Sequence, residues 1–203
     1  MTTEGERRYI AYLAMSKLYP RNPTDPLALV PFDEQLLDDA STDAKNSPRR
    51  RNILRFHEHS DYLQRMLNAI EPESYARPHQ HRDPDKVEIF VALRGSVLMV
   101  RFSEEGVPLE GVVVSAGGPV RGVDVPAGAW HCLLSLESGT VLFEVKEGPY
   151  DAATDKRFAE WSPPEEDREA SLEYMSQLRV HFASLIPELA ARDLIEAEED
   201  DIC

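Results

Sequence analysis

The sequence is poor in cysteine, with only Cys132 and Cys203 among 203 residues. A disulfide-stabilised secreted domain needs several paired cysteines, and a CxxC redox or zinc motif needs two of them close together. Both classes are therefore excluded. The scarcity is typical of proteins in a reducing compartment, so we expect a cytoplasmic location.

Long apolar runs and positive charge are also missing. No segment approaches the roughly 20 apolar residues of a membrane-spanning helix, and residues 1–8 lack the basic-then-apolar order of a secretion signal. The chain has 22 Lys and Arg against 37 Asp and Glu, a formal net charge of -15. Nucleic acids and anionic membranes attract basic surfaces, so we expect neither as a partner.

Short apolar segments with a period of two fill the middle of the chain, which is typical of β-strands. Glycine-containing turn signals at 94–95, 105–106 and 138–139 separate several of them. We predict strands over 74–79, 87–94, 97–103, 110–115, 120–125, 130–136 and 140–147. Short strands with no helix between them predict a mainly β fold, a small β-barrel or jelly roll.

Helical spacing of apolar residues occurs on both sides of this region. We predict a helix over 6–18, short helices over 32–40 and 61–70, a loop over 41–48, and C-terminal helices over 163–186 and 188–197. Ser162 and Glu165 have capping-box spacing, and this pattern predicts where the C-terminal helices begin. The chain then divides into an N-terminal helical extension (1–30), a central domain (31–164) and C-terminal helices with an acidic tail (165–203).

An apolar stripe runs along the expected C-terminal helix. It consists of Leu172, Met175, Leu178, Phe182 and Leu185. Together with the N-terminal helix, it offers more apolar surface than a small barrel needs to cover its own faces. We therefore predict a homodimer with twofold symmetry, the commonest symmetric assembly.

Three histidines and one glutamate form the strongest functional pattern. His79 and His81 are two residues apart and would project from one face of a strand. Glu88 opens the next apolar run, and His131 heads a later one. Imidazole and carboxylate ligands suit transition metals. We predict that these four residues bind one divalent transition metal (iron, zinc, manganese or nickel) inside the barrel.

The order His-x-His, Glu, Gly, then Pro-x-Gly-x-x-His resembles the two-part signature of the cupin superfamily. The spacing from Glu88 to Gly95 fits the first part, and residues 126–131 fit the second. Six residues separate His81 from Glu88, where the general pattern has three or four, and Ser135 stands where the second part often has Asn. The resemblance implies a double-stranded β-helix with a metal site.

Segments 74–79, 143–150 and 155–161 resemble the WbuC-type cupin metalloproteins, and this resemblance extends from about residue 32 to 164. It implies a bacterial protein associated with surface-polysaccharide (O-antigen) biosynthesis. The expected role is to bind or act on a small anionic sugar or a sugar-nucleotide-like molecule.

Three classes of function stay open, and with them the question whether the protein is an enzyme. One is a metal-dependent isomerase or epimerase acting on a sugar, with the metal holding adjacent oxygens. Another is an Fe(II)-dependent dioxygenase, for which a histidine-rich site with open positions is suitable. The third is a non-catalytic module that binds a small molecule.

Glu144 and Lys146 share one face of the last predicted strand. On an outer face they would form an ordinary ion pair. In the barrel interior, Glu144 could act as a base, while Lys146 could bind an anionic group or transfer a proton. They are the candidate catalytic residues.

A basic segment begins at Arg49-Arg50-Arg51, the one cationic cluster in an acidic chain. It is either a solvated loop with ion pairs or a site for a phosphate or carboxylate. Strand parity also places Tyr75 and Arg77, which precede His79, on the same face as the histidines. The candidate ligand-binding residues are Asn52, Arg55, His57, Tyr75 and Arg77. A small anionic molecule is the favoured ligand.

Overall fold

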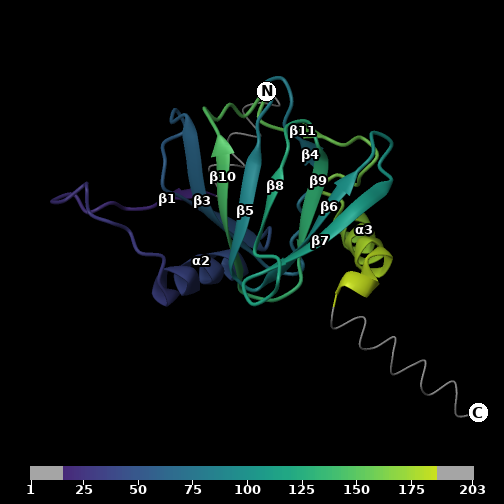
Figure 1. Ribbon diagram of the computed structural model, residues 1–203, viewed down its shortest axis with the longest axis horizontal. Helices are drawn as coiled ribbons and strands as arrows, with labels where there is room; N and C mark the ends of the chain where they lie inside the picture. The colour runs from purple at the N-terminus through teal and green to yellow at the C-terminus, as the bar shows by residue number, and fades with distance from the viewer. Residues whose placement is uncertain (1–15, 187–203) are drawn as a thin grey trace, which may run out of the picture.

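The computed structural model describes residues 16–186, and its two β-sheets face each other (Figure 1). The six-stranded sheet has the order β1 (Ser16–Leu18), β2 (Arg51–Arg55), β3 (Leu63–Ile70), β10 (Thr140–Glu147), β5 (Glu88–Arg94) and β8 (Gly122–Val125). The five-stranded sheet has the order β11 (Arg157–Phe158), β4 (His79–Gln80), β9 (Trp130–Ser135), β6 (Ser96–Phe102) and β7 (Pro108–Ser115). The prediction of a mainly β fold is confirmed.

Alternating side chains of both sheets fill the space between them. The apolar part of this interior includes Phe90 and Ala92 of β5, Leu133 of β9 and Leu142 of β10. Phe90 and Ala92 share the parity of Glu88, and Leu133 shares that of His131, so all three face the interior together with these residues. The neighbour of His131, Cys132, lies in a different core on the outer face, as its parity predicts.

Helix α2 (Glu34–Asn46) covers the outer face of the six-stranded sheet. Its N-cap, Asp33, accepts a hydrogen bond from the Leu36 N–H at 3.0 Å. The helix predicted over 32–40 is therefore confirmed, but the loop predicted over 41–48 is wrong. Ala44 is fully buried against the sheet, so packing extends the helix through residues whose local preference is for a turn.

Helix α3 (Arg168–His181) and the short 3-10 helix η1 (Ala183–Leu185) cover the five-stranded sheet. The N-cap of α3 is Asp167, whose carboxylate accepts from the Ala170 N–H at 3.1 Å. The predicted capping box is wrong, because the Ser162 hydroxyl donates to the Ala159 carbonyl instead. The helix therefore begins several residues later than expected.

The apolar stripe of α3 is used largely within the chain. Met175, Leu178 and Phe182 pack on the sheet, while Leu172 and Leu185 stay 39% and 43% exposed. The stripe thus leaves less apolar surface than the sequence suggested, and the homodimer stays a prediction.

The helix predicted over 61–70 is wrong, because this segment is strand β3. It lies between β2 and β10 in the centre of its sheet. Met66 is 2% exposed and points to the interior, while Leu67 is 0% exposed and packs toward α2. Burial on both faces removes the alternation that identifies a strand in a sequence.

The remaining differences lie at the edges of the fold. The helix predicted over 6–18 does not reach its expected end, because Ser16–Leu18 form β1 beside β2; residues 6–15 lie outside the described residues. The helix predicted over 188–197 and the acidic tail lie outside them too. Of the strand predicted over 74–79, only His79 belongs to β4. No helix within residues 16–186 is long and apolar enough to span a membrane.

Candidate metal centre

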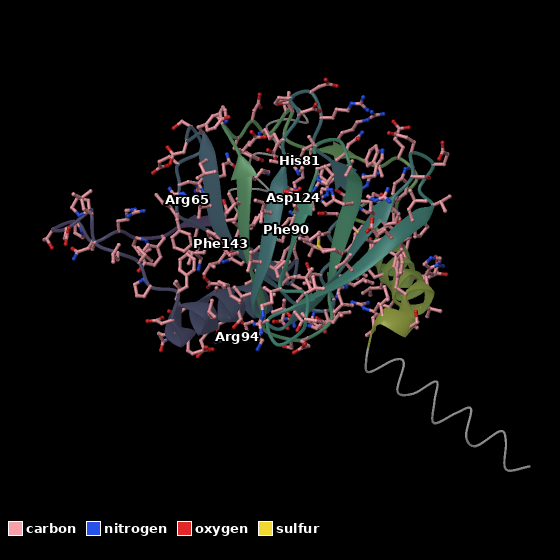
Figure 2. All side chains as sticks on the ribbon, in the orientation of Figure 1. Arg65, His81, Phe90, Arg94, Asp124 and Phe143 are labelled. Carbon is pink, nitrogen blue, oxygen red and sulfur yellow. The ribbon has the colours of Figure 1, made fainter. Side chains whose placement is uncertain are left out.

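Four buried side chains meet at one end of the barrel interior. They are His79 of β4, the adjacent His81, Glu88 at the start of β5 and His131 of β9, and one ligand atom of each lies within 4.8 Å of the others. His79 and His131 are cross-strand partners. In Figure 2, His81 lies toward the end of the barrel away from Arg94. The four predicted ligands are therefore brought together.

Each imidazole is held by its Nδ1 atom. The Nδ1 atoms of His79 and His131 lie 2.9 Å from the carbonyl oxygens of Arg77 and Ala129, and that of His81 contacts the carbonyl oxygen of Asp155. A carbonyl oxygen only accepts, so each Nδ1 carries the hydrogen. Each Nε2 is then a lone-pair donor, the state in which histidine binds a metal.

The Glu88 carboxylate faces two of these lone pairs. Its Oε1 lies 3.0 Å from His81 Nε2 and its Oε2 lies 2.9 Å from His131 Nε2. Within residues 16–186, His81 Nε2, His131 Nε2 and Glu88 Oε2 make no hydrogen bond of acceptable geometry. Lone pairs this close repel unless a cation lies among them. This donor set fits a divalent transition metal.

The electrostatics of the four residues agree with metal binding. Burial lowers the pKa of His79 well below its usual 6.5 and also lowers the pKa of His81. Both imidazoles are therefore neutral at pH 7, as metal ligands must be. Burial alone raises the pKa of Glu88, but positive charge nearby, including the Lys146 ammonium 3.8 Å away, holds that pKa well below 4.5. The carboxylate is thus ionised.

A buried cluster of charged side chains lies next to the four residues. Asp155 accepts hydrogen bonds from Lys146 Nζ at 2.9 Å and from Lys86 Nζ at 3.0 Å, and Lys146 Nζ lies 3.8 Å from Glu88 Oε1. Burial would raise the pKa of Asp155, but Lys146 lowers it to about 2. Burial lowers the pKa of Lys146, yet Asp155 and Glu88 raise it above its usual range. Lys146 is therefore a permanent ammonium group.

Asp155 was missed as a site residue in the sequence. The available signal was its position at the start of segment 155–161, one of the segments on which the family expectation was based. Its contacts could not be read from a pattern, because Asp155 reaches the site from a loop.

Glu144 lies one layer deeper in the barrel. It is 5% exposed, and its Oε2 accepts a hydrogen bond from Asn68 Nδ2 at 2.9 Å. Burial, together with repulsion from Glu88, raises its pKa to about 6. The structure thus places both Glu144 and Lys146 in the interior, where the sequence left two faces open.

Two candidate ligand-binding residues point away from the barrel interior. Tyr75 packs in the core beneath α3, and its hydroxyl donates to the Pro163 carbonyl at 3.0 Å. Arg77 donates to the Ala159 carbonyl at 2.6 Å. The expectation that they share the histidines' face is wrong because β4 begins only at His79, so strand parity does not extend to them.

The other three candidates lie toward the edge of the six-stranded sheet. Asn52 is opposite Ala69 and shares its outer face, toward α2. Arg55 donates to the Ser16 hydroxyl at 3.2 Å and to the His57 carbonyl at 3.1 Å. His57 follows the end of β2, and burial lowers its pKa. Neither Asn52 nor Arg77 therefore faces the interior at the end where the three histidines lie.

The basic triplet Arg49-Arg50-Arg51 forms ion pairs. This agrees with the interpretation as an ion-paired loop and not with the interpretation as a phosphate or carboxylate site. Arg49 and Arg51 both pair with Glu165, the latter at 2.7 Å, and Arg50 lies 3.5 Å from Glu73. Arg49, Arg51 and Glu165 also line a groove of about 200 Å³ beside α3. This groove lies outside the barrel and does not include the four histidine and glutamate ligands.

Comparisons with known proteins add little to this geometry. A family model described as "Domain of unknown function (DUF6016)" matches residues 32–114, less than half of the chain. No curated protein matches the sequence.

Several solved structures match weakly. KdgF from Halomonas sp. is 19% identical, with 51% of this chain and 81% of that chain covered and a TM-score of 0.39. The capsular polysaccharide assembling protein CapF from Staphylococcus aureus is 19% identical, with 52% and 31% covered and a TM-score of 0.43. An oxalate decarboxylase variant from Bacillus subtilis is 20% identical, with 49% and 24% covered and a TM-score of 0.39. At these scores, no conclusion about this chain rests on the likeness.

Proposed function

We propose that this protein is a cupin-fold metalloprotein that binds one divalent transition metal through His79, His81, Glu88 and His131. A small anionic, oxygen-rich molecule, such as a sugar acid or a sugar-nucleotide-like compound, binds beside the metal. One observation carries the proposal: buried Nε2 lone pairs face a carboxylate at 2.9–3.0 Å without hydrogen-bonding geometry. The two-part sequence signature on a two-sheet β fold supports it.

The balance of charge supports an anionic ligand. Lys86 and Lys146 are buried, and the half-buried Lys156 is electrostatically coupled to the carboxylates of the site. A metal dication and three lysines would face three carboxylates, those of Glu88, Glu144 and Asp155, so the site would be net positive. Buried cations are stable only with anionic partners, and a bound carboxylate or phosphate would be one.

Two side chains near the proposed metal have properties suited to catalysis. When bound, the metal would supply Lewis acidity and hold substrate oxygens in place. Lys146, as a permanent ammonium, donates hydrogen bonds and stabilises negative charge on a substrate. Without the metal, burial and the Glu88 carboxylate raise the pKa of Glu144 to about 6, and a carboxyl group in this position can accept or donate a proton. This pairing suits an isomerisation or epimerisation that moves a proton.

The alternatives are an Fe(II)-dependent dioxygenase and a non-catalytic binding module. The donor set of three histidines and one carboxylate leaves positions open at an octahedral metal, which suits oxygen chemistry. The relation to WbuC-type proteins and surface polysaccharides, and a cytoplasmic location, belong to the same proposal. Oxygen consumption by the iron-loaded protein separates the dioxygenase from the other two classes.

Thermal unfolding of the metal-loaded protein tests the anionic ligand. Citrate, phosphate and a sugar nucleotide are added in turn at millimolar concentration. A ligand at 100 times its dissociation constant stabilises the folded state by about 2.7 kcal/mol, which corresponds to several degrees in midpoint. The shift should be much smaller in the His81→Ala variant. If no anion moves the midpoint of the wild type, the anionic ligand is contradicted.

A further inference from the structure

A row of three buried polar side chains crosses the six-stranded sheet at its metal end. Lys146 of β10 is opposite Gln64 of β3 on one side and opposite Glu88 of β5 on the other. Cross-strand partners project from the same face, so Gln64 faces the interior that contains Glu88. Strands in a sheet are about 4.8 Å apart, which places the Gln64 backbone roughly 10 Å from that of Glu88.

The carboxamide of Gln64 is buried without a partner. The residue is 0% exposed, and neither its Nε2 nor its Oε1 forms a hydrogen bond within residues 16–186. The neighbouring Lys146 directs its ammonium toward Asp155 and Glu88. An unpaired buried amide destabilises a protein, whereas an apolar side chain of the same size would not. The amide therefore points to a partner from outside the chain.

A second unpaired acceptor lies on the same face of the strand. Asn68 shares the parity of Gln64 on β3, and its Nδ2 is engaged by Glu144. Its Oδ1 is buried and has no hydrogen-bond partner in the part of the chain that the structure describes. The interior face of β3 thus offers one amide donor and two amide acceptors.

We propose that Gln64 is a specificity-determining residue that binds the hydroxylated end of a metal-bound hydroxy acid. This inference rests on the proposed function, because the other end of the ligand lies at the metal. A hydroxyl group both donates and accepts, so it can pair with an amide oxygen, which a carboxylate or phosphate cannot. The anionic end has the metal and Lys146 as partners. The ligand class is therefore a short-chain acid with several hydroxyl groups, such as a sugar acid.

Two probes separate the contribution of Gln64 from that of the metal. Glycolate and D-gluconate share a 2-hydroxy-carboxylate end, but only gluconate continues into a hydroxylated chain. Both are titrated into the Co(II)-loaded protein, and the visible spectrum of cobalt reports binding. The wild type should bind gluconate more tightly than glycolate. Gln64→Met should weaken gluconate by about 3- to 10-fold, the effect of one lost hydrogen bond, and leave glycolate and the cobalt stoichiometry unchanged.

Leu67→Met is the matched control. Leu67 lies on the same strand and is equally buried, but it packs on the opposite face toward α2. This variant should change the affinity for neither probe. A further readout is the unfolding midpoint of the metal-free protein, which Gln64→Met should leave equal or raise, because the change removes an unpaired buried amide.

The outcomes distinguish this inference from the proposed function. If the wild type binds no cobalt, or binds neither probe, the proposed function itself fails. If cobalt binds but gluconate is no tighter than glycolate, or Gln64→Met weakens both probes alike, the role of Gln64 is overturned. A lower midpoint for metal-free Gln64→Met would show that the amide is already satisfied within the folded protein, and would overturn it as well.

Discussion

The two ends of the barrel interior are built by the same strands but differ in chemistry. At one end, β5 and β10 present Glu88 and Lys146, which belong to the metal centre and its ionic support. Four residues away along these strands lie Ala92 and Leu142, which belong to the apolar core. The register therefore places the apolar core at one end of the interior and the proposed metal site with its charged neighbours at the other.

The difference between the ends has an energetic consequence. Burial of Leu142 is favourable without any ligand. Burial of Glu88, Lys146 and Asp155 is costly, and is tolerated only because each charge has a partner. Changes at the polar end should thus alter both stability and the binding of metal and ligand, while changes at the apolar end should alter stability alone.

The largest loss of stability is expected from Asp155→Asn. The change removes the counter-charge of two buried ammonium groups, Lys86 and Lys146. Loss of one partner from a buried ionic group lowers the free energy of unfolding by about 3–5 kcal/mol. Chemical denaturation of the wild type and the variant measures this difference. Glu160→Gln, at an exposed position nearby, should cost less than about 0.5 kcal/mol. An equal effect of the two variants would contradict the ionic role of Asp155.

At the apolar end, Leu142→Ala should lower the free energy of unfolding by about 3 kcal/mol, because it leaves a cavity in the core. Its metal content per folded molecule should stay unchanged. Leu109→Ala, which alters a side chain that is 52% exposed, is the control and should have little effect. Loss of metal affinity in Leu142→Ala would show that the two ends are not separable.

Glu144 should give a smaller, pH-dependent effect in the metal-free protein. Its folded pKa of about 6 lies above its usual 4.5, so its contribution to stability is greatest below pH 4.5 and is lost as pH rises through 6. Glu144→Gln should therefore stabilise the protein by about 2 kcal/mol at pH 7.5. At pH 4 it should have little effect. Exposed Glu105, changed to Gln, should show no such dependence in the same denaturation series.

Much of the fold and of the centre could be predicted from the sequence because the signals are local. The strand predicted over 140–147 matches β10, since alternation and flanking turns mark it. The four candidate ligands meet although the interval from His81 to Glu88 is long, because that interval forms a turn and leaves the register of β5 intact.

The errors arise where the answer depends on tertiary contacts. Gln64 was missed because β3 is buried on both faces and resembles a helix in sequence. Tyr75 and Arg77 were misplaced because parity applies only after a strand has begun. Asp155 acts from a loop, whose position no periodicity predicts.

Metal content tests the central claim most directly. The purified protein should contain about one transition-metal ion per chain, measured by elemental analysis. His79→Ala, His81→Ala and His131→Ala should each remove most of it, and Glu88→Gln should lower the affinity by a smaller factor. His181→Ala alters a histidine of α3 that lies beside Phe182, and should keep the full content. Full metal occupancy in the His81→Ala protein would contradict the assignment of the centre.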